Sequence, residues 1–371
     1  MAFAGGGSLQ QYVIPFLNQS GIEGPWSTMV LSSLYLSFAV FRLLNLYLLP
    51  LLSPRMPLAL GLLTYAFLPG VMLWWPKTPA LLVAAVLWGW GASSAWMTSS
   101  LSITQLTEDR DRGKGAGMLY AGVHAGFLLG VPLIGSLSAL QKSQLAMHWV
   151  FWVTVAGALA SLGSRPHTRY RSGPPWKSLI PREKDQWIVT FVQFASSLAY
   201  GLMLGSFAAL VRQRLHWSAT GIYTLFYALR FVLSLLAGET ADRFPLRTLL
   251  SAAFLLSSLS LAVSSLTQGF LGLAVGATGL ALQVAVVPVA CLALVGRGTA
   301  AERPQRYAVS FVGRDLGVAC ALLAGLMQEA GKIPSLETTI AFFAILFLAC
   351  SVLCALLTRN KAAAAPSPAK S

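Results

Sequence analysis

The stretch Tyr35-Leu-Ser-Phe38-Ala-Val-Phe-Arg42 recurs 188 positions later as Tyr223-Thr-Leu-Phe226-Tyr-Ala-Leu-Arg230. Each copy is followed, at the same spacing, by an Arg-x-Pro-Leu turn that begins at Arg55 or at Arg243. Because tyrosine, phenylalanine and arginine fall at i, i+3 and i+7, they share one face of a helix. The repeat therefore indicates a chain built from two homologous helical halves.

The composition indicates that these helices lie in a membrane. Hydrophobic residues make up 56% of the 371 residues and charged residues only 10%, with a mean hydropathy of +0.67. A bilayer core of ~30 Å requires ~20 apolar residues per helix, and eleven segments of that kind follow one another as far as Leu357. The sequence predicts an all-α polytopic membrane protein with 11 to 12 transmembrane helices in two pseudo-symmetric bundles.

The first segment, Ala2 to Leu17, is too short to span and is interrupted by Gln10 and Gln11. It lacks the basic start and the small-residue cleavage site of a signal peptide. We expect a shortened or trimmed first helix, with the true start possible upstream.

The basic loop residues divide the chain into domains and orient it. Most of them fall on alternate loops, which places that side in the cytoplasm of a plasma or inner membrane. We expect a first bundle over 1–163, a basic, proline-rich cytoplasmic linker over 164–186, a second bundle over 187–358 and a disordered cytoplasmic tail over 359–371.

The net charge of +14 follows from this asymmetry. It indicates contact with membrane lipids and requires no nucleic acid as a partner. No phosphate-binding loop or metal-ligand spacing is found, and the four cysteines lie inside apolar segments. We therefore expect a monomeric protein without metal or cofactor that is not an enzyme.

The segment Gly238-Glu-Thr-Ala-Asp242-Arg243-Phe-Pro-Leu-Arg247 resembles the signature loop of the major facilitator superfamily, in which a glycine precedes Asp-Arg and a second basic residue. The resemblance implies two six-helix bundles that work by alternating access. It also implies that Gly238, Asp242, Arg243 and Arg247 form a cytoplasmic gate. The alternative is an ordinary charged turn. In the first half the motif is degenerate, because Pro50 and Pro54 replace the glycine and the aspartate.

A second repeat pairs Gly122-x-His124-x-Gly126 with Gly313-Arg314-Asp315-Leu-Gly317 at an offset of 191. Glycines four residues apart allow helices to pack closely. The second copy resembles the eleventh helix of some facilitator transporters. The region from Gly89 to Gly130, together with Gln10-Gln11-Tyr12, is also loosely similar to the uncoordinated-like branch of the superfamily, which implies a regulatory or trafficking role.

Few charges remain inside the spans, namely Arg42, Arg230, Arg314 and Asp315. Each costs on the order of 3 kcal/mol near mid-membrane unless it is paired or faces water. Substrate binding is the predicted role of Arg42 and Arg230, with Tyr35, Tyr223 and Asn45 beside them. The alternative is that the arginines cap carbonyls or bond tyrosines.

Histidine titrates near neutral pH, and a buried carboxyl group can do so. His124 and Asp315, with Arg314 adjacent, are therefore candidates for proton coupling, although packing roles remain open for all three. The function predicted is a secondary transporter of a small solute by alternating access, with an anionic solute and proton coupling as the further features that these residues favour. A non-transporting membrane adaptor, chaperone or regulator on the same fold is the alternative.

Overall fold

The computed structural model describes residues 1–22, 25–53, 55–164, 179, 184–215, 220–267, 269–329, 332 and 335–357. Over these residues the chain is helical and contains no strand. Eleven helical spans of the described part are long and apolar enough to cross a membrane. The predicted all-α polytopic class is therefore confirmed.

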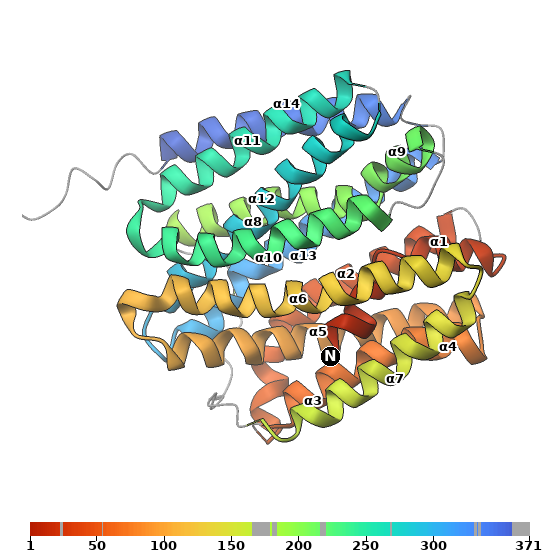
Figure 1. The fold of residues 1–371 in the computed structure, drawn as a ribbon. Coiled ribbons are helices and arrows are strands. Elements are labelled where there is room, and N and C mark those ends of the chain that lie inside the picture. The colour runs from red at the N-terminus through yellow and green to blue at the C-terminus, as the bar shows by residue number, and fades with distance from the viewer. Residues whose placement is uncertain are drawn as a thin grey trace, which may run out of the picture.

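The helices form two groups that follow each other along the chain and lie side by side (Figure 1). The first group contains η1 (Phe3–Gly7), α1 (Val13–Gln19), α2 (Pro25–Leu48), α3 (Met56–Leu63), α4 (Phe67–Trp74), α5 (Thr78–Leu106), α6 (Arg112–Ala139) and α7 (Ser143–Ser161). The second contains α8 (Lys184–Leu204), α9 (Ser206–Leu215), α10 (Thr220–Arg243), α11 (Leu246–Leu266), α12 (Phe270–Gly296), α13 (Arg303–Glu329) and α14 (Leu336–Leu357). Short 3-10 turns η2 (Leu49–Leu51), η3 (Thr64–Ala66) and η4 (Asp109–Asp111) join helices of the first group.

The two bundles meet mainly through two helix pairs, α2 against α13 and α6 against α10, with smaller contacts of α12 with α5 and α6 and of α13 with α5. In Figure 1, α11 and α14 lie on the outer side of one bundle, and α3, α4 and α7 on that of the other. With α3–α4 and α8–α9 each counted as one span, α2 and α10 are the second helices of their bundles, and α6 and α13 are the fifth. Each of the two main contacts thus joins a second helix to a fifth helix of the opposite bundle.

The α6–α10 contact is close because glycines face each other across it. A Cβ atom on Gly238 would lie 2.7 Å from the carbonyl oxygen of Gly113 and 3.1 Å from the Cα of Gly117. Small residues at such positions allow two membrane helices to approach backbone to backbone. The second glycine repeat acts similarly on α13, where a Cβ on Gly313 or Gly317 would meet backbone oxygens of α8.

The first helix of each bundle is interrupted. In the first bundle, the π-helical turn η1 and α1 are separated by turns at Gln10–Tyr12, so the segment is a broken helix and not simply a shortened one. In the second bundle, Gly205 separates α8 from α9. Interrupted helices at matching positions of two repeats are typical of transporter binding sites. The expected linker over 164–186 and tail over 359–371 lie almost entirely outside the described residues.

Candidate functional site

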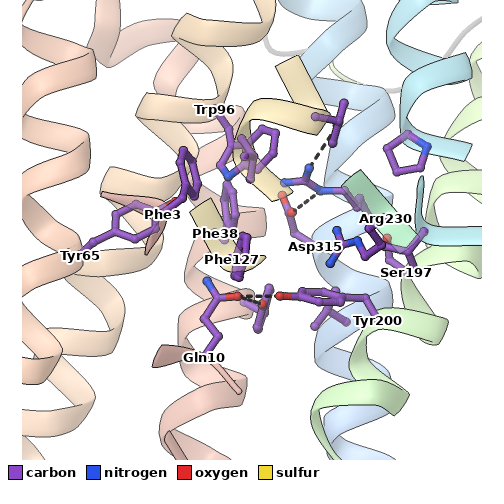
Figure 2. A pocket seen from close by; sticks show the side chains of 17 residues that line it. Phe3, Gln10, Phe38, Tyr65, Trp96, Phe127, Ser197, Tyr200, Arg230 and Asp315 are labelled. Atoms are coloured by element: carbon purple, nitrogen blue, oxygen red, sulfur yellow. Dashed lines mark hydrogen bonds and ion pairs between the residues drawn. The ribbon is translucent and has the colours of Figure 1, made fainter. Parts of the chain in front are cut away.

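A cavity lies between the two bundles, and helices of both contribute to its wall. Its wall is largely aromatic, and Figure 2 shows the charged residues Arg230 and Asp315 on one side of it. The aromatic members are Phe3, Tyr35, Phe38, Tyr65, Trp96, Tyr120, Phe127 and Tyr200, and the charged ones are Arg230, Arg314 and Asp315. The cavity measures about 60 Å³, which is room for a few water molecules. Ligand pockets typically measure ~300–1,000 Å³, so the bundles are contracted around the site in this state.

Arg42 of α2 forms a buried ion pair with Asp315 of α13. Its Nη2 lies 2.8 Å and its Nε 3.0 Å from Oδ2 of Asp315, while Nη1 donates to the Tyr307 hydroxyl at 2.9 Å. The Arg42 side chain is fully buried and does not line the cavity. Arg42 therefore joins the bundles in this state and does not enter the cavity as the sequence-based hypothesis expected.

Arg314 lines the cavity and shares the same carboxylate. Its Nε donates to Oδ1 of Asp315 at 3.2 Å, and its Nη1 lies 3.5 Å from the Tyr120 hydroxyl. The guanidinium also lies over the rings of Trp96 and Phe38. One carboxylate thus serves two guanidiniums, and its hydrogen bonds with described side chains all go to them.

Arg230 of α10 lines the cavity and forms no ion pair with another described residue. Its residue exposure is 7%, and neither Nε nor Nη1 has a hydrogen-bond partner among the described residues. The guanidinium carbon lies 4.9 to 5.2 Å from the ring centroids of Tyr200, Phe226 and Tyr227. Such contacts contribute about 0.5–2 kcal/mol each, which stabilises the cation but leaves its donors free for an anion.

His124 of α6 lies behind the cavity wall, against the backbone of α10. Its Nδ1 is 3.2 Å from the Arg230 carbonyl oxygen and 3.1 Å from Oγ of Ser234, and its Nε2 has no partner among the described residues. The imidazole is fully buried. His124 and Asp315 both lie at the contact between a fifth helix and the second helix of the other bundle, as their offset predicts.

The structure places only one of the three remaining predicted substrate residues at the cavity. Tyr35 lines the cavity. Tyr223 does not; its ring packs edge-on against Tyr12, and its hydroxyl lacks a partner among the described residues. Asn45 is buried within the first bundle, where its Nδ2 donates to Ser93 and Ser94 at 2.9 and 3.1 Å. Tyr223 and Asn45 thus have packing contacts here and no access to the cavity.

Gln10 and Gln11 form a clasp between the bundles that sequence reasoning did not identify as part of the site. Oε1 of Gln10 accepts hydrogen bonds from the hydroxyls of Tyr35 at 2.7 Å and Tyr200 at 3.0 Å, as Figure 2 shows in part. Nε2 of Gln11 donates to the Tyr227 hydroxyl at 2.5 Å. The signal available was the pair of amides inside an apolar segment, which breaks the helix where the cavity begins.

Asp242 closes one end of the bundle contact. Its Oδ1 and Oδ2 accept hydrogen bonds from the backbone N–H groups of Gly113 at 2.7 Å and Lys114 at 3.0 Å, in the first turn of α6. A carboxylate in this place is favoured by the helix dipole. We call this end of the molecule the Asp242 end, and the opposite end, where α10 begins, the Thr220 end.

The other predicted gate residues contribute differently. Gly238 permits the close approach of α6, as described above. Arg243 is exposed and Arg247 half-buried, and neither forms an ion pair with another described residue. At the α2–α13 side of the Asp242 end, Nη1 of Arg303 instead donates to the Thr104 carbonyl at 3.0 Å. No cluster of metal-ligating side chains occurs within the described ranges.

Comparisons with known proteins agree with this architecture. The family model of the Major Facilitator Superfamily matches residues 1–183. A probable 4-methylmuconolactone transporter of Cupriavidus pinatubonensis is 28% identical over 139 residues, which cover 35% of this chain and 32% of that protein. The match thus spans about a third of the curated relative.

Solved structures match over nearly the whole chain. The human organic anion transporter MFSD10 has a TM-score of 0.68 at 17% identity, with 93% of this chain and 89% of that chain covered. The major facilitator transporter FucP in the outward conformation has a TM-score of 0.66 at 15% identity, with 95% and 96% covered. The Escherichia coli fucose:proton symporter FucP, in a variant form, gives the same values. At these identities the likeness establishes the fold alone.

Proposed function

Because the chain belongs to the major facilitator superfamily, we propose that it is a secondary transporter that carries a small organic anion by alternating access. The observation that carries this proposal is Arg230, a buried cation with free donors on a cavity between the bundles. A charge at this depth is costly unless it meets a partner. An anionic solute supplies that partner when it enters.

The charged residues of the cavity wall support a negative charge on the solute. Arg230 and Arg314 line it together with a single carboxylate, Asp315, which is already bonded to Arg314 and Arg42. The described wall is therefore electropositive. A cation or a zwitterion would place positive charge against Arg230, so the site favours an anion.

The gates support alternating access. Asp242 holds α6 against α10 at one end, and the Gln10–Gln11 clasp holds tyrosines of both bundles at the other side of the cavity. The cavity is too small for an organic solute in this state. Transport requires each closure to open in turn, which is the expected behaviour of two bundles that rock about a fixed site.

If the protein were a non-transporting adaptor, the charged residues inside the spans would be buried against neighbouring helices and would line no cavity. Arg42 fits that description, but Arg230, Arg314 and Asp315 do not, because they line a cavity. The curated relative is named as a transporter of an organic solute. We therefore favour transport over the adaptor role.

The protein is a multi-pass membrane protein. We propose that it acts as a monomer in a plasma or inner membrane, with the Asp242 end in the cytoplasm, as the loop charges favour. Proton coupling through Asp315 and His124 remains part of the proposal. Since Asp315 is bonded to two guanidiniums here, proton carriage requires another state in which the Arg42 pair is broken.

Uptake into proteoliposomes tests the function. Benzoate, succinate, glucose and choline are supplied as labelled solutes, with an imposed pH gradient and without one. We expect uptake of an anion that is lost in Arg230→Gln and kept in Arg297→Gln, an exposed arginine of the same bundle. Transport of glucose or choline that survives Arg230→Gln would contradict the proposal.

A further inference from the structure

The two copies of the repeated motif place their arginines in the same local geometry. The guanidinium carbon of Arg42 lies 4.4 Å from the ring centroid of Phe38, four residues earlier, and that of Arg230 lies 5.1 Å from the ring of Phe226, also four residues earlier. Both side chains thus lean along their helices in the same direction. The two guanidiniums occupy corresponding places in the two bundles.

The residues that face them from the opposite bundle differ. Across the α2–α13 contact, Asp315 reaches the guanidinium of Arg42 and neutralises it. Across the α10–α6 contact the corresponding residue is His124, whose Nδ1 contacts the backbone oxygen of Arg230 and Ser234. Arg230 therefore has the surroundings of an arginine in an ion pair, but the residue that faces it is a histidine and not a carboxylate. We call the space beside the Arg230 guanidinium, equivalent to the place of the Asp315 carboxylate at Arg42, the Arg230 socket.

We propose that the carboxylate of the transported solute takes, at Arg230, the place that Asp315 takes at Arg42. This inference rests on the proposed function and specifies its substrate class. A planar guanidinium binds a carboxylate through two parallel N–H···O bonds from one edge, and at Arg42 the edge formed by Nε and Nη2 faces Asp315. Nε of Arg230 has no hydrogen-bond partner among the described residues, so the corresponding edge of Arg230 is the one that would bind the carboxylate. One free guanidinium matches one carboxylate, so the solute is a monocarboxylate.

The rest of the wall specifies the body of that solute. It is mostly aromatic, and Figure 2 shows Phe3, Tyr65 and Trp96 across the cavity from Arg230 and Ser197. The hydroxyls of Tyr35 and Tyr200 are already bonded to Gln10. Because few polar groups are left for hydroxyl-rich solutes and flat aromatic faces are plentiful, the site favours a monocarboxylate with a planar, unsaturated ring.

A fixed carboxylate at position 124 tests the idea directly. Binding of benzoate and of the neutral amide benzamide is measured by calorimetry on the full chain in detergent, in His124→Asp and in His124→Asn, which has similar size and no charge. The aspartate should occupy the Arg230 socket. We expect benzoate binding at least tenfold weaker in H124D than in H124N, with benzamide affinity within a factor of three between them.

Arg230→Gln supplies a second measurement should H124D fold poorly. It should bind benzoate at least tenfold more weakly than the wild type, without a comparable loss for benzamide. Equal benzoate binding by H124D and H124N, or by R230Q and the wild type, would overturn the inference. If the wild type binds no benzoate but the proteoliposomes carry another anion, the inference fails and the proposed function stands. If no anion is carried, both fail.

Discussion

The Arg42 guanidinium and the Asp315 carboxylate lie 2.8 Å apart in the protein interior and come from helices of different bundles. Arg314, adjacent in sequence to Asp315, lines the cavity and donates to the other carboxylate oxygen. A cross-bundle connection and the wall of the candidate site therefore share one side chain. Movement of α13 relative to α2 must change the charge that the cavity presents.

Asp315→Leu should destabilise the chain strongly, because it leaves Arg42 and Arg314 without a counter-charge. Loss of one member of a buried pair costs about 3–5 kcal/mol. The double variant Arg42→Met with Asp315→Leu should recover a large part of that loss. Unfolding in mixed detergent micelles measures both. A double variant as unstable as the single one would show that the pair is not the source of the cost.

Arg230→Lys should weaken anion binding about tenfold although the positive charge is kept, because an ammonium group lacks the planar two-point contact with a carboxylate. Calorimetry with the anion that the uptake screen identifies measures the change. Arg297→Lys, at an exposed position of the same bundle, is the matched control. Equal affinity in Arg230→Lys would show that Arg230 contributes only its positive charge and not a two-point contact with the anion.

Asp242→Asn should slow transport and leave membrane insertion intact. The amide keeps one acceptor oxygen but loses the charge at the start of α6, an interaction of up to ~2 kcal/mol when partly buried. That loss shifts the population towards states open at the Asp242 end. Initial uptake rates measure the effect, and Glu239→Gln, on the exposed side of the same helix, serves as control. An unchanged rate would reduce the motif to a helix-capping turn.

Gln10→Leu should loosen the clasp, because leucine has a similar size and cannot accept from Tyr35 and Tyr200. In a background without the native cysteines, a Ser197→Cys probe in the cavity wall should react several times faster with a membrane-impermeant maleimide added from the Thr220 end. Gln19→Leu, at an exposed position beyond the break, controls for the loss of an amide. Equal labelling rates would show that Gln10 does not hold the cavity closed.

The duplicated motifs predicted much of the fold. Their offsets placed Arg42 and Arg230 on second helices and His124 and Asp315 on fifth helices, and the spacing of Gly313 and Gly317 marked the close contact of α13 with α8. On α6, the close contact with α10 is formed by Gly113 and Gly117, which the repeat did not include. The first helix was predicted only in part. A truncated helix and a helix broken in its middle can both have a short apolar sequence with two amide side chains, so the sequence did not distinguish them. At the interruption of the first helix, Gln10 and Gln11 bond to tyrosines of both bundles, and periodicity along one segment does not contain such contacts.

The site was harder to predict, since identical motifs gave no indication of which arginine is neutralised. Arg42 was expected in the cavity, but the Asp315 carboxylate and the Tyr307 hydroxyl hold it away. Arg314, expected beside Asp315, is bonded to it and also lines the cavity, where no role had been predicted for it. Tyr223 shares the helical face of Arg230 but packs against Tyr12. These outcomes depend on pairings across the bundle interface, which periodicity along one helix does not contain.

The unequal pairing of the two arginines has an evolutionary consequence. The two repeats place an arginine in equivalent surroundings. The residue at one position of the facing helix decides whether that arginine forms an ion pair within the protein, as Arg42 does with Asp315, or keeps donors without a protein partner, as Arg230 does beside His124. Codons for histidine and aspartate differ by one base. On the proposed role of Arg230, a single nucleotide change at position 124 or 315 would therefore suffice to close one binding site or to create another.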